Sequence, residues 1–340
     1  MSALTAPEDG ESEIENGEPP RRRRWPPAVA LALALAVSAP VAFAQESLAW
    51  LTRAAEAART LNYVGTIVYQ YGNRVETSRL THLYERGVES EKLVNLDGPA
   101  REVIRTQEEV RCYYPDAKVL RIEPRTFRNA FPALSAPQLK ALTDYYSPRR
   151  AETVRVAGVD AQAYIFEPKD RYRFRQKFWV DVNTGLLLKV RIANERNETV
   201  EQFAFTDLTI GGTIDRAGVQ PTWSGAPPGW HVQQLVPNKV ENKDTGWQVE
   251  RLPPGFTKTG EGLRTMQGKR DPVAHLVYSD GLVAVSVFIE PVGSAPRASG
   301  SVQIGGTNVF IRQVDDYIVT VLGEAPNATV RHIANSVTRR

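Results

Sequence analysis

Alternation of apolar and polar residues with a period of two dominates the chain from residue 63 to residue 210. In 63–71, YVGTIVYQY, the odd positions place three tyrosines and an isoleucine on one face, as in a half-buried strand. Similar runs lie near 76–85, 89–96, 101–106, 109–115, 117–122, 151–156, 160–168, 172–182, 186–194 and 198–210. An antiparallel sheet of this many strands must curl or close to protect its edges. We therefore predict an α+β fold, mainly antiparallel β, built on a half-open β-barrel.

Helical periodicity interrupts the strands at two places. Residues 45–61 repeat apolar side chains every three or four positions, beginning with Leu48 and Leu51. A second, shorter helix is predicted over 137–146. Each has one apolar face, so we expect these helices to plug the open side of the barrel.

The first 44 residues have the order of a secretory signal. Four arginines at 21–24 precede ten unbroken apolar residues at 28–37, and Ala42-Phe43-Ala44 supplies small residues for cleavage. An uncleaved anchor helix is the alternative, but the apolar run is short and Pro40 would break a spanning helix. The sequence therefore predicts a signal peptide over 1–44.

Cleavage after Ala44 would start the mature chain at Gln45, which is not the cysteine that a lipid anchor needs. The chain has 42 basic and 39 acidic residues, a mildly basic balance that favours acidic partners or anionic lipid over nucleic acid. The single cysteine, Cys112, excludes an internal disulfide. These features predict a periplasmic protein that is not membrane-spanning after signal cleavage.

A Gly/Pro-rich segment divides the mature chain. Residues 211–230 contain eight glycines or prolines among twenty, which is typical of a linker between domains. We therefore predict a half-barrel domain over 45–210 and a smaller C-terminal α+β domain over 231–340. The strands of the second domain are expected near 247–252, 273–279, 282–290, 307–313 and 316–323, and a helix is expected after Pro326.

Catalytic constellations are absent from the sequence. It contains no H-E-x-x-H, G-x-S-x-G or S-x-x-K motif and no phosphate-binding glycine loop. The four histidines are far apart, and one cysteine with four histidines does not make a zinc cluster. We expect no enzyme activity, no catalytic residues, no metal site and no cofactor.

The segment 170–182 carries two candidate binding features. Four cations alternate with apolar residues, and the functional interpretation is that they meet an anionic protein segment or lipid phosphates; these are Arg171, Arg173, Arg175 and Lys177. The alternative is a solvated outer face of a strand. Five aromatic residues on inner faces could line an apolar cavity for an acyl chain; these are Tyr69, Tyr71, Tyr172, Phe174 and Phe178. A barrel filled by its own side chains is the alternative there.

The sequence resembles the RseB/MucB family of periplasmic regulators of envelope-stress sigma factors. The stretches that carry the resemblance are 61–66 (LNYVGT), 96–103 (LDGPAREV), 179–181 (WVD), 184–189 (TGLLLK), 201–203 (EQF), 252–256 (LPPGF) and 277–282 (VYSDGL). They occur in order along nearly the whole mature chain, so together they are specific.

The resemblance implies a function that composition does not show. Family members have a large half-barrel like that of the LolA/LolB lipoprotein carriers, joined to a small C-terminal domain. They bind the periplasmic domain of a membrane anti-sigma factor of the RseA/MucA type and shield it from regulated proteolysis. Lipid signals such as lipopolysaccharide are thought to loosen the complex, so lipid and anti-sigma factor must weaken each other's binding.

One hairpin of the second domain is a further candidate for partner contact. It contains Tyr278, Asp280, Gly281 and Leu282, although its alternative role is simply to turn one strand into the next. The rival function for the whole chain is a periplasmic lipid or lipoprotein carrier of the LolA type. That function explains 45–210 and leaves the second domain without a role.

Overall fold

The computed structural model describes residues 39–125, 136–234, 244–264, 271–293, 299–304 and 306–340. The predicted signal peptide therefore lies almost wholly outside the described residues. None of the helices in these ranges is long and apolar enough to cross a membrane.

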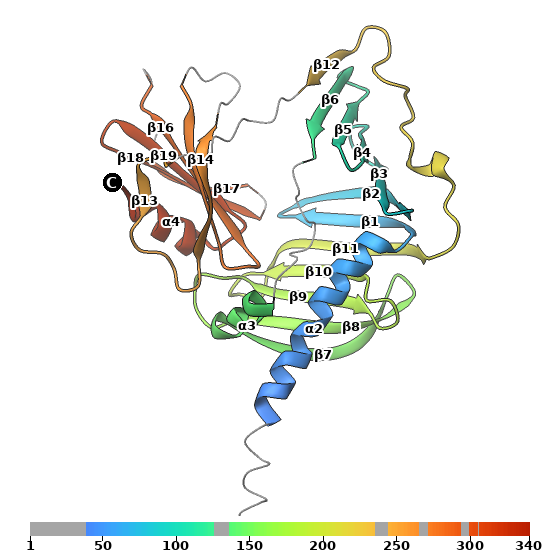
Figure 1. Cartoon of the computed structure of the whole chain (residues 1–340), viewed down its shortest axis with the longest axis horizontal. Helices are drawn as coiled ribbons and strands as arrows, with labels where there is room; N and C mark the ends of the chain where they lie inside the picture. The colour runs from blue at the N-terminus through green and yellow to red at the C-terminus, as the bar shows by residue number, and fades with distance from the viewer. Residues whose placement is uncertain (1–38, 126–135, 235–243, 265–270, 294–298, 305) are drawn as a thin grey trace, which may run out of the picture. The chain divides into compact units, whose positions relative to one another are not determined.

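A sheet of twelve strands forms the larger part of the structure (Figure 1). Its spatial order is β12-β6-β5-β4-β3-β2-β1-β11-β10-β9-β8-β7, so β12 and β7 are edges and the sheet does not close into a barrel. All neighbours are antiparallel except β12 and β6. The strands are β1 (Tyr63–Tyr71), β2 (Arg74–Glu85), β3 (Val88–Asn95), β4 (Glu102–Arg105), β5 (Glu109–Tyr114), β6 (Val119–Pro124), β7 (Tyr146–Val156), β8 (Val159–Pro168), β9 (Arg175–Asp181), β10 (Leu187–Ala193), β11 (Thr199–Ile210) and β12 (His231–Gln234).

The helix α2 (Ala39–Thr60) crosses the part of this sheet that contains β8 and β9 (Figure 1). Its side chains Leu48, Trp50 and Leu51 are buried with Phe166 of β8 and Phe178 of β9. Burying a large apolar side chain contributes roughly 1.5–3 kcal/mol, so this interface is a main source of stability. The shorter helix α3 (Ala136–Tyr145) leads directly into β7.

A second, smaller β domain follows. Its six-stranded sheet has the order β14-β15-β16-β19-β18-β17. Valines of β16 and β19 are fully buried with Val330 and Ile333 of α4, which closes one face of the sheet. The elements are β13 (Trp247–Val249), β14 (Thr257–Arg264), β15 (Val273–Ser279), β16 (Ala284–Pro291), β17 (Gly300–Ile304), β18 (Thr307–Val314), β19 (Tyr317–Gly323), α4 (Asn327–Asn335) and β20 (Val337–Arg339).

The predicted fold class, an open and mainly antiparallel β architecture with few helices and a smaller second domain, is confirmed. Three short or exposed strands, β14, β17 and β20, were not expected from the sequence. Residues 231–234, expected in the C-terminal domain, instead form β12 and pair with β6 of the large sheet. The Gly/Pro-rich segment before them is packed, since Trp223 and Trp230 both contact the ring of Tyr113.

Lowering the pH from about 6.5 to 4 is expected to destabilise the C-terminal sheet through His275. Burial and the charge of Arg264 lower the pKa of this imidazole to about 4. Its Nε2 lies 3.1 Å from Oγ of Ser286, and its ring stacks on Phe288. An unfolded histidine has a pKa of about 6.5, so the unfolded chain takes up the proton first as the pH falls. The contribution is therefore complete above pH 6.5 and lost towards pH 4, by about 2–3 kcal/mol.

Urea unfolding of the wild type and of His275→Gln at pH 7 and at pH 4.5 measures this contribution. The glutamine can still reach Ser286 but does not titrate in this range, so the other ionisable groups act equally on both proteins. The difference in free energy of unfolding between them should shrink at pH 4.5. An unchanged difference would contradict the prediction.

Candidate functional site

The four predicted cations do not form one exposed stripe. The strand β9 begins at Arg175, and residues 171–174 form a turn that leads into it. Arg171 is exposed, whereas Arg173 is buried, with no part of its side chain accessible to solvent. The expectation that Arg173 lies on a solvated face is therefore wrong, because the alternation of a strand does not extend into the turn.

The two cations inside β9 are half-buried and paired. The guanidinium of Arg175 donates to Oε1 of Glu167 at 2.7 Å, and the ammonium of Lys177 donates to Oε1 of Glu152 at 2.5 Å. Lys177 Nζ also lies 4.7 Å from the ring centroid of Trp179. Pairs of this kind on the surface contribute about 0–1 kcal/mol, so they leave the two cations available to a competing anion.

Arg173 is the centre of a buried junction between the large sheet and the second domain. Its Nε donates to Oδ2 of Asp280 at 2.7 Å, and neither side chain is accessible to solvent. Its other nitrogens donate to Asp170 and to the carbonyl oxygen of Pro254. The hydroxyl of Tyr146 donates to the same Oδ2 of Asp280 at 3.1 Å. Each charge is therefore surrounded by partners, as a buried ion pair requires.

Aromatic rings enclose the same guanidinium. Its central carbon lies 4.8 Å from the ring centroid of Tyr145, 5.2 Å from that of Phe256 and 5.6 Å from that of Tyr146. Contacts of cations with aromatic faces strengthen when water is excluded. Burial and the neighbouring carboxylate of Asp280 raise the pKa of Tyr146 well above its usual value, which keeps its hydroxyl protonated as a donor.

The candidate hairpin supplies the acidic partner of this junction. Its turn is held by Oδ1 of Asp280, which accepts from the backbone N–H groups of Leu282 and Val283. Gly281 has a φ of 102°, and Tyr278 is buried in the core of the second domain. The structure therefore places these residues against the large sheet and in the core, which favours the structural role over contact with a partner.

The five aromatic residues predicted to line a lipid cavity are not brought together. Tyr69 and Tyr71 lie on β1, which β11 and β10 separate from β9. Phe178 is buried against Trp50 of α2, with ring centroids 5.3 Å apart. The helix thus fills the space that an acyl chain was expected to occupy at β9.

The remaining two aromatic residues lie near the second domain. Phe174 is buried, and the ring of Tyr172 meets that of His332 in α4 edge to face. The carbonyl oxygen of Tyr172 accepts from the hydroxyl of Thr329 at 2.7 Å. These contacts place residues 172–174 in the junction and away from the cavity that Tyr69 and Tyr71 line.

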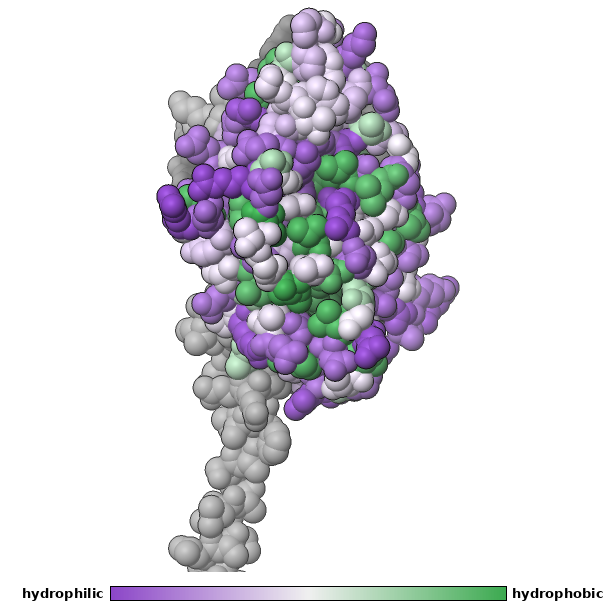
Figure 2. Space-filling view, turned by 90° about the vertical axis from the view of Figure 1, so that its right-hand side faces the viewer, coloured by the Kyte–Doolittle hydropathy of each residue, from purple (hydrophilic) through white to green (hydrophobic). Residues whose placement is uncertain are grey.

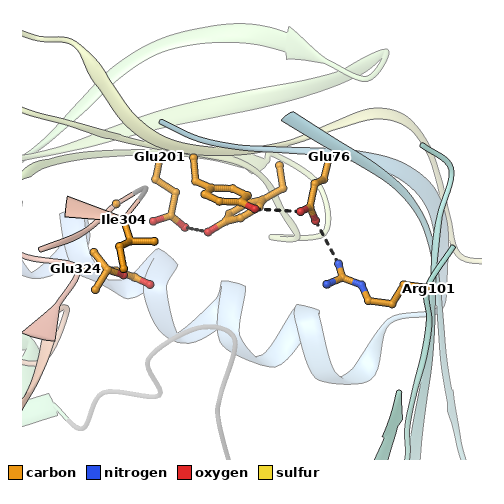
Figure 3. A pocket seen from close by; sticks show the side chains of 9 residues that line it. Glu76, Arg101, Glu201, Ile304 and Glu324 are labelled. Atoms are coloured by element: carbon orange, nitrogen blue, oxygen red, sulfur yellow. Dashed lines mark hydrogen bonds and ion pairs between the residues drawn. The ribbon is translucent and has the colours of Figure 1, made fainter. Parts of the chain in front are cut away.

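That cavity has a volume of about 350 Å³ and a polar lining (Figure 3). It is lined by Tyr69, Tyr71, Glu76, Arg101, Glu201, Ile304, Gly306, Thr307 and Glu324. The tyrosine hydroxyls donate to carboxylates, Tyr69 to Glu201 at 2.6 Å and Tyr71 to Glu76 at 3.1 Å. Sequence reasoning missed the three carboxylates, because they come from β2, from β11 and from the residue after β19, and share no local motif.

Neither site has the geometry of a metal centre. Across the described ranges, no group of three or more His, Cys, Asp or Glu side chains is placed to hold a metal ion.

One face of the described structure carries apolar side chains in its middle, with hydrophilic side chains around them (Figure 2). The apolar side chains lie in several groups separated by hydrophilic ones, and apolar surface gathered on one face is typical of contacts with proteins or lipids.

Two family models match consecutive parts of the chain. The MucB/RseB N-terminal domain matches residues 46–223, and the MucB/RseB C-terminal domain matches residues 241–338. The chain belongs to the MucB/RseB family. The resemblance found in the sequence is thereby confirmed. The first match ends at residue 223, inside the predicted linker 211–230, and the second begins after that linker.

Several MucB/RseB relatives are similar over nearly their whole length. The sigma factor AlgU regulatory protein MucB of Pseudomonas aeruginosa is 33% identical over 320 residues, which is 90% of this chain and 95% of that protein. The sigma-E factor regulatory protein RseB of Salmonella typhimurium is 25% identical over 282 residues, 83% of this chain and 87% of that protein. The crystal structure of MucB in complex with MucA(peri) superimposes with a TM-score of 0.67 at 32% identity, covering 86% of this chain and 98% of the other.

Proposed function

We propose that this chain is a periplasmic regulator that binds the periplasmic segment of a membrane anti-sigma factor. The observation that carries the proposal is the MucB structure solved with MucA(peri), which is 32% identical and covers 86% of this chain. Bound in this way, the regulator shields the anti-sigma factor from proteolysis, so the sigma factor stays sequestered. The mechanism is steric protection, in which no bond is made or broken.

Two features of this chain support the periplasmic setting and the release step. The signal predicted over 1–44 would export the chain. The apolar side chains on the face in Figure 2 form a surface on which lipid or lipopolysaccharide could act. Release by lipid requires that lipid binds the free regulator more tightly than it binds the complex. By linkage, the ratio of these two lipid affinities equals the factor by which lipid lowers the affinity for the anti-sigma factor.

Arg171, Arg175 and Lys177 are proposed as a contact for an anionic partner. Arg171 is exposed, and Arg175 and Lys177 are half-buried with single carboxylate partners. Arg173 is left out of this surface because its donors are already used inside the protein.

Mature protein 45–340 is expected to bind the periplasmic segment of the anti-sigma factor encoded by the same genome, with saturation in a calorimetric titration. Adding lipopolysaccharide micelles should weaken this binding. Arg175→Glu should also weaken it, most strongly at low salt, because added salt screens the charge of residue 175 from an anionic partner. Uptake of lipid without any binding of the segment would instead support the carrier function. A segment that binds with the same affinity with and without lipid would contradict the release mechanism.

A further inference from the structure

We propose that the cavity lined by Tyr69, Tyr71, Glu76 and Glu201 binds a basic side chain, arginine or lysine, of an extended polypeptide partner. The inference rests on the proposed function only for the identity of that polypeptide, the anti-sigma factor segment. The preference of the cavity for a cation follows from its own residues.

The lining of the cavity carries more negative than positive charge. The lining contains three carboxylates, those of Glu76, Glu201 and Glu324, and one guanidinium, that of Arg101 (Figure 3). Arg101 is already paired with Glu76, with 3.2 Å between Nη2 of the arginine and Oε2 of the glutamate. The carboxylate of Glu201 accepts from the neutral hydroxyl of Tyr69 and has no cationic partner among the described residues. A cation that enters therefore meets the negative charge of Glu201, whereas an anion would be repelled.

Glu201 offers an acceptor that no protein donor occupies. Its Oε1 accepts from the hydroxyl of Tyr69, and its Oε2 accepts no hydrogen bond from any residue that the structure describes. Burial, followed by the hydrogen bond to Glu201, raises the pKa of Tyr69, so this hydroxyl stays a donor and fixes the carboxylate. A guanidinium or ammonium can pair with the remaining oxygen through a charge-assisted hydrogen bond.

Aromatic walls complete a site for an organic cation. The rings of Tyr69 and Tyr71 lie with their centroids 5.3 Å apart and their planes tilted by 33°. Aromatic faces attract ammonium and guanidinium groups and pack against their aliphatic stems. A bare metal ion fits less well, because the carboxylates in the described residues do not converge as metal ligands do and the cavity is about 350 Å³ in volume.

The rim of the cavity favours a polypeptide over a free amine. Ile304 lines the cavity and ends β17, which is an edge of the six-stranded sheet among the described residues. All five residues of β17 are exposed, and the alternating Val302 and Ile304 are 52% and 66% accessible to solvent. An edge strand with exposed backbone and apolar side chains is a template for pairing with an extended chain. Such a chain would present alternate side chains to the cavity.

Gly306 brings this edge against the carboxylate. A Cβ built at Gly306 would lie 2.8 Å from Oε2 of Glu201, so only glycine at position 306 lets the backbone there approach the carboxylate so closely. The strand edge and the acidic cavity are thus adjacent parts of one surface. A partner paired with β17 would have a side chain within reach of Glu201.

A small probe tests the preference for a cation without any partner protein. The protein is labelled with 3-fluorotyrosine, the signals of Tyr69 and Tyr71 are assigned with Tyr→Phe variants, and N-acetyl-argininamide is titrated. We expect saturable shifts of these two signals, and binding about tenfold or more weaker for N-acetyl-citrullinamide, which has the same shape and no charge. Equal binding of the two compounds, or no saturable shift, would overturn the proposal.

Paired variants test the role of Glu201. Glu201→Gln removes the charge and keeps an acceptor for Tyr69, whereas Glu195→Gln removes a charge from an exposed turn. We expect Glu201→Gln to lose the preference for the argininamide and Glu195→Gln to keep it. If Glu201→Gln binds as tightly as the wild type, the proposal is wrong.

The anti-sigma factor segment then tests the identity of the partner. Its basic residues are changed to glutamine one at a time, and one change should weaken binding to the wild type about tenfold while having little effect on Glu201→Gln. If every change has the same effect on binding to the wild type and to Glu201→Gln, the polypeptide part of the proposal is wrong. A segment that does not bind the wild type at all would refute the proposed function, while charge-selective binding of the argininamide would still support the cavity.

Discussion

Replacing Arg173 with methionine is expected to lower the free energy of unfolding by about 3–5 kcal/mol. The change leaves the carboxylate of Asp280 buried, without a counter-ion and with no access to water. It also removes donors from the carbonyl oxygen of Pro254 and from Asp170. Methionine keeps most of the apolar contact with the surrounding rings. The loss of stability is therefore caused by removal of the positive charge and not by removal of side-chain volume.

A second variant separates the unpaired charge from other effects. Asp280→Asn keeps Oδ1 as the acceptor for the N–H groups of Leu282 and Val283 and removes the negative charge. The double variant with Arg173→Met should therefore be less destabilised than Arg173→Met alone, because no buried carboxylate remains unpaired. Urea unfolding followed by tryptophan fluorescence gives all three values.

Arg175→Met is the matched control for this series. Its guanidinium also pairs with a carboxylate, but both partners are more than a third exposed. We expect this change to lower the free energy of unfolding by about 0–1 kcal/mol. Equal losses from Arg173→Met and Arg175→Met, or strict additivity of Arg173→Met and Asp280→Asn, would show that Arg173 and Asp280 do not act as a buried pair.

The strands that bury one face could be predicted from the sequence, and the exposed ones could not. Period-two alternation located the strands β1 to β11, each of which except β3 contains at least one buried residue. The strands β14 and β17 lie at the two edges of the smaller sheet and carry mostly exposed or partly exposed residues. Without a buried face, an edge strand has no alternation for the sequence to show.

The buried junction and the cavity could not be predicted from local sequence patterns, because each is formed by residues that are far apart in the sequence. Arg173 and Asp280 are 107 positions apart, and nothing near either residue indicates that the other will neutralise it. The alternation correctly predicted that Arg175 lies on the more exposed face of β9. It failed at Arg173, which lies in the turn before the strand and is buried. Similarly, Tyr69 was recognised as an inward aromatic residue, but the acidic character of its surroundings depends on Glu201, which is 132 positions away.

Replacing Gly255 with alanine is expected to destabilise the same junction by about 2–4 kcal/mol. Gly255 has a φ of +80°, and a Cβ at this position would lie 2.3 Å from a ring carbon of Tyr145. That ring packs against the guanidinium of Arg173, whose partner Pro254 immediately precedes the glycine. The alanine must therefore strain the backbone and also displace Tyr145 from the buried cation.

Gly229→Ala separates the two contributions. Gly229 has nearly the same φ, +82°, and a Cβ there would meet nothing within 4 Å. This control should show only the backbone strain of about 1 kcal/mol, so the difference between the two variants measures the steric clash at Tyr145. Thermal unfolding of both variants beside the wild type gives the comparison. If both variants lose the same free energy of unfolding, Tyr145 moves aside without cost, and the packing around Arg173 is looser than its contacts indicate. If Gly255→Ala loses clearly more stability than Gly229→Ala, the turn 252–256 is required to hold Tyr145 and Arg173 in place.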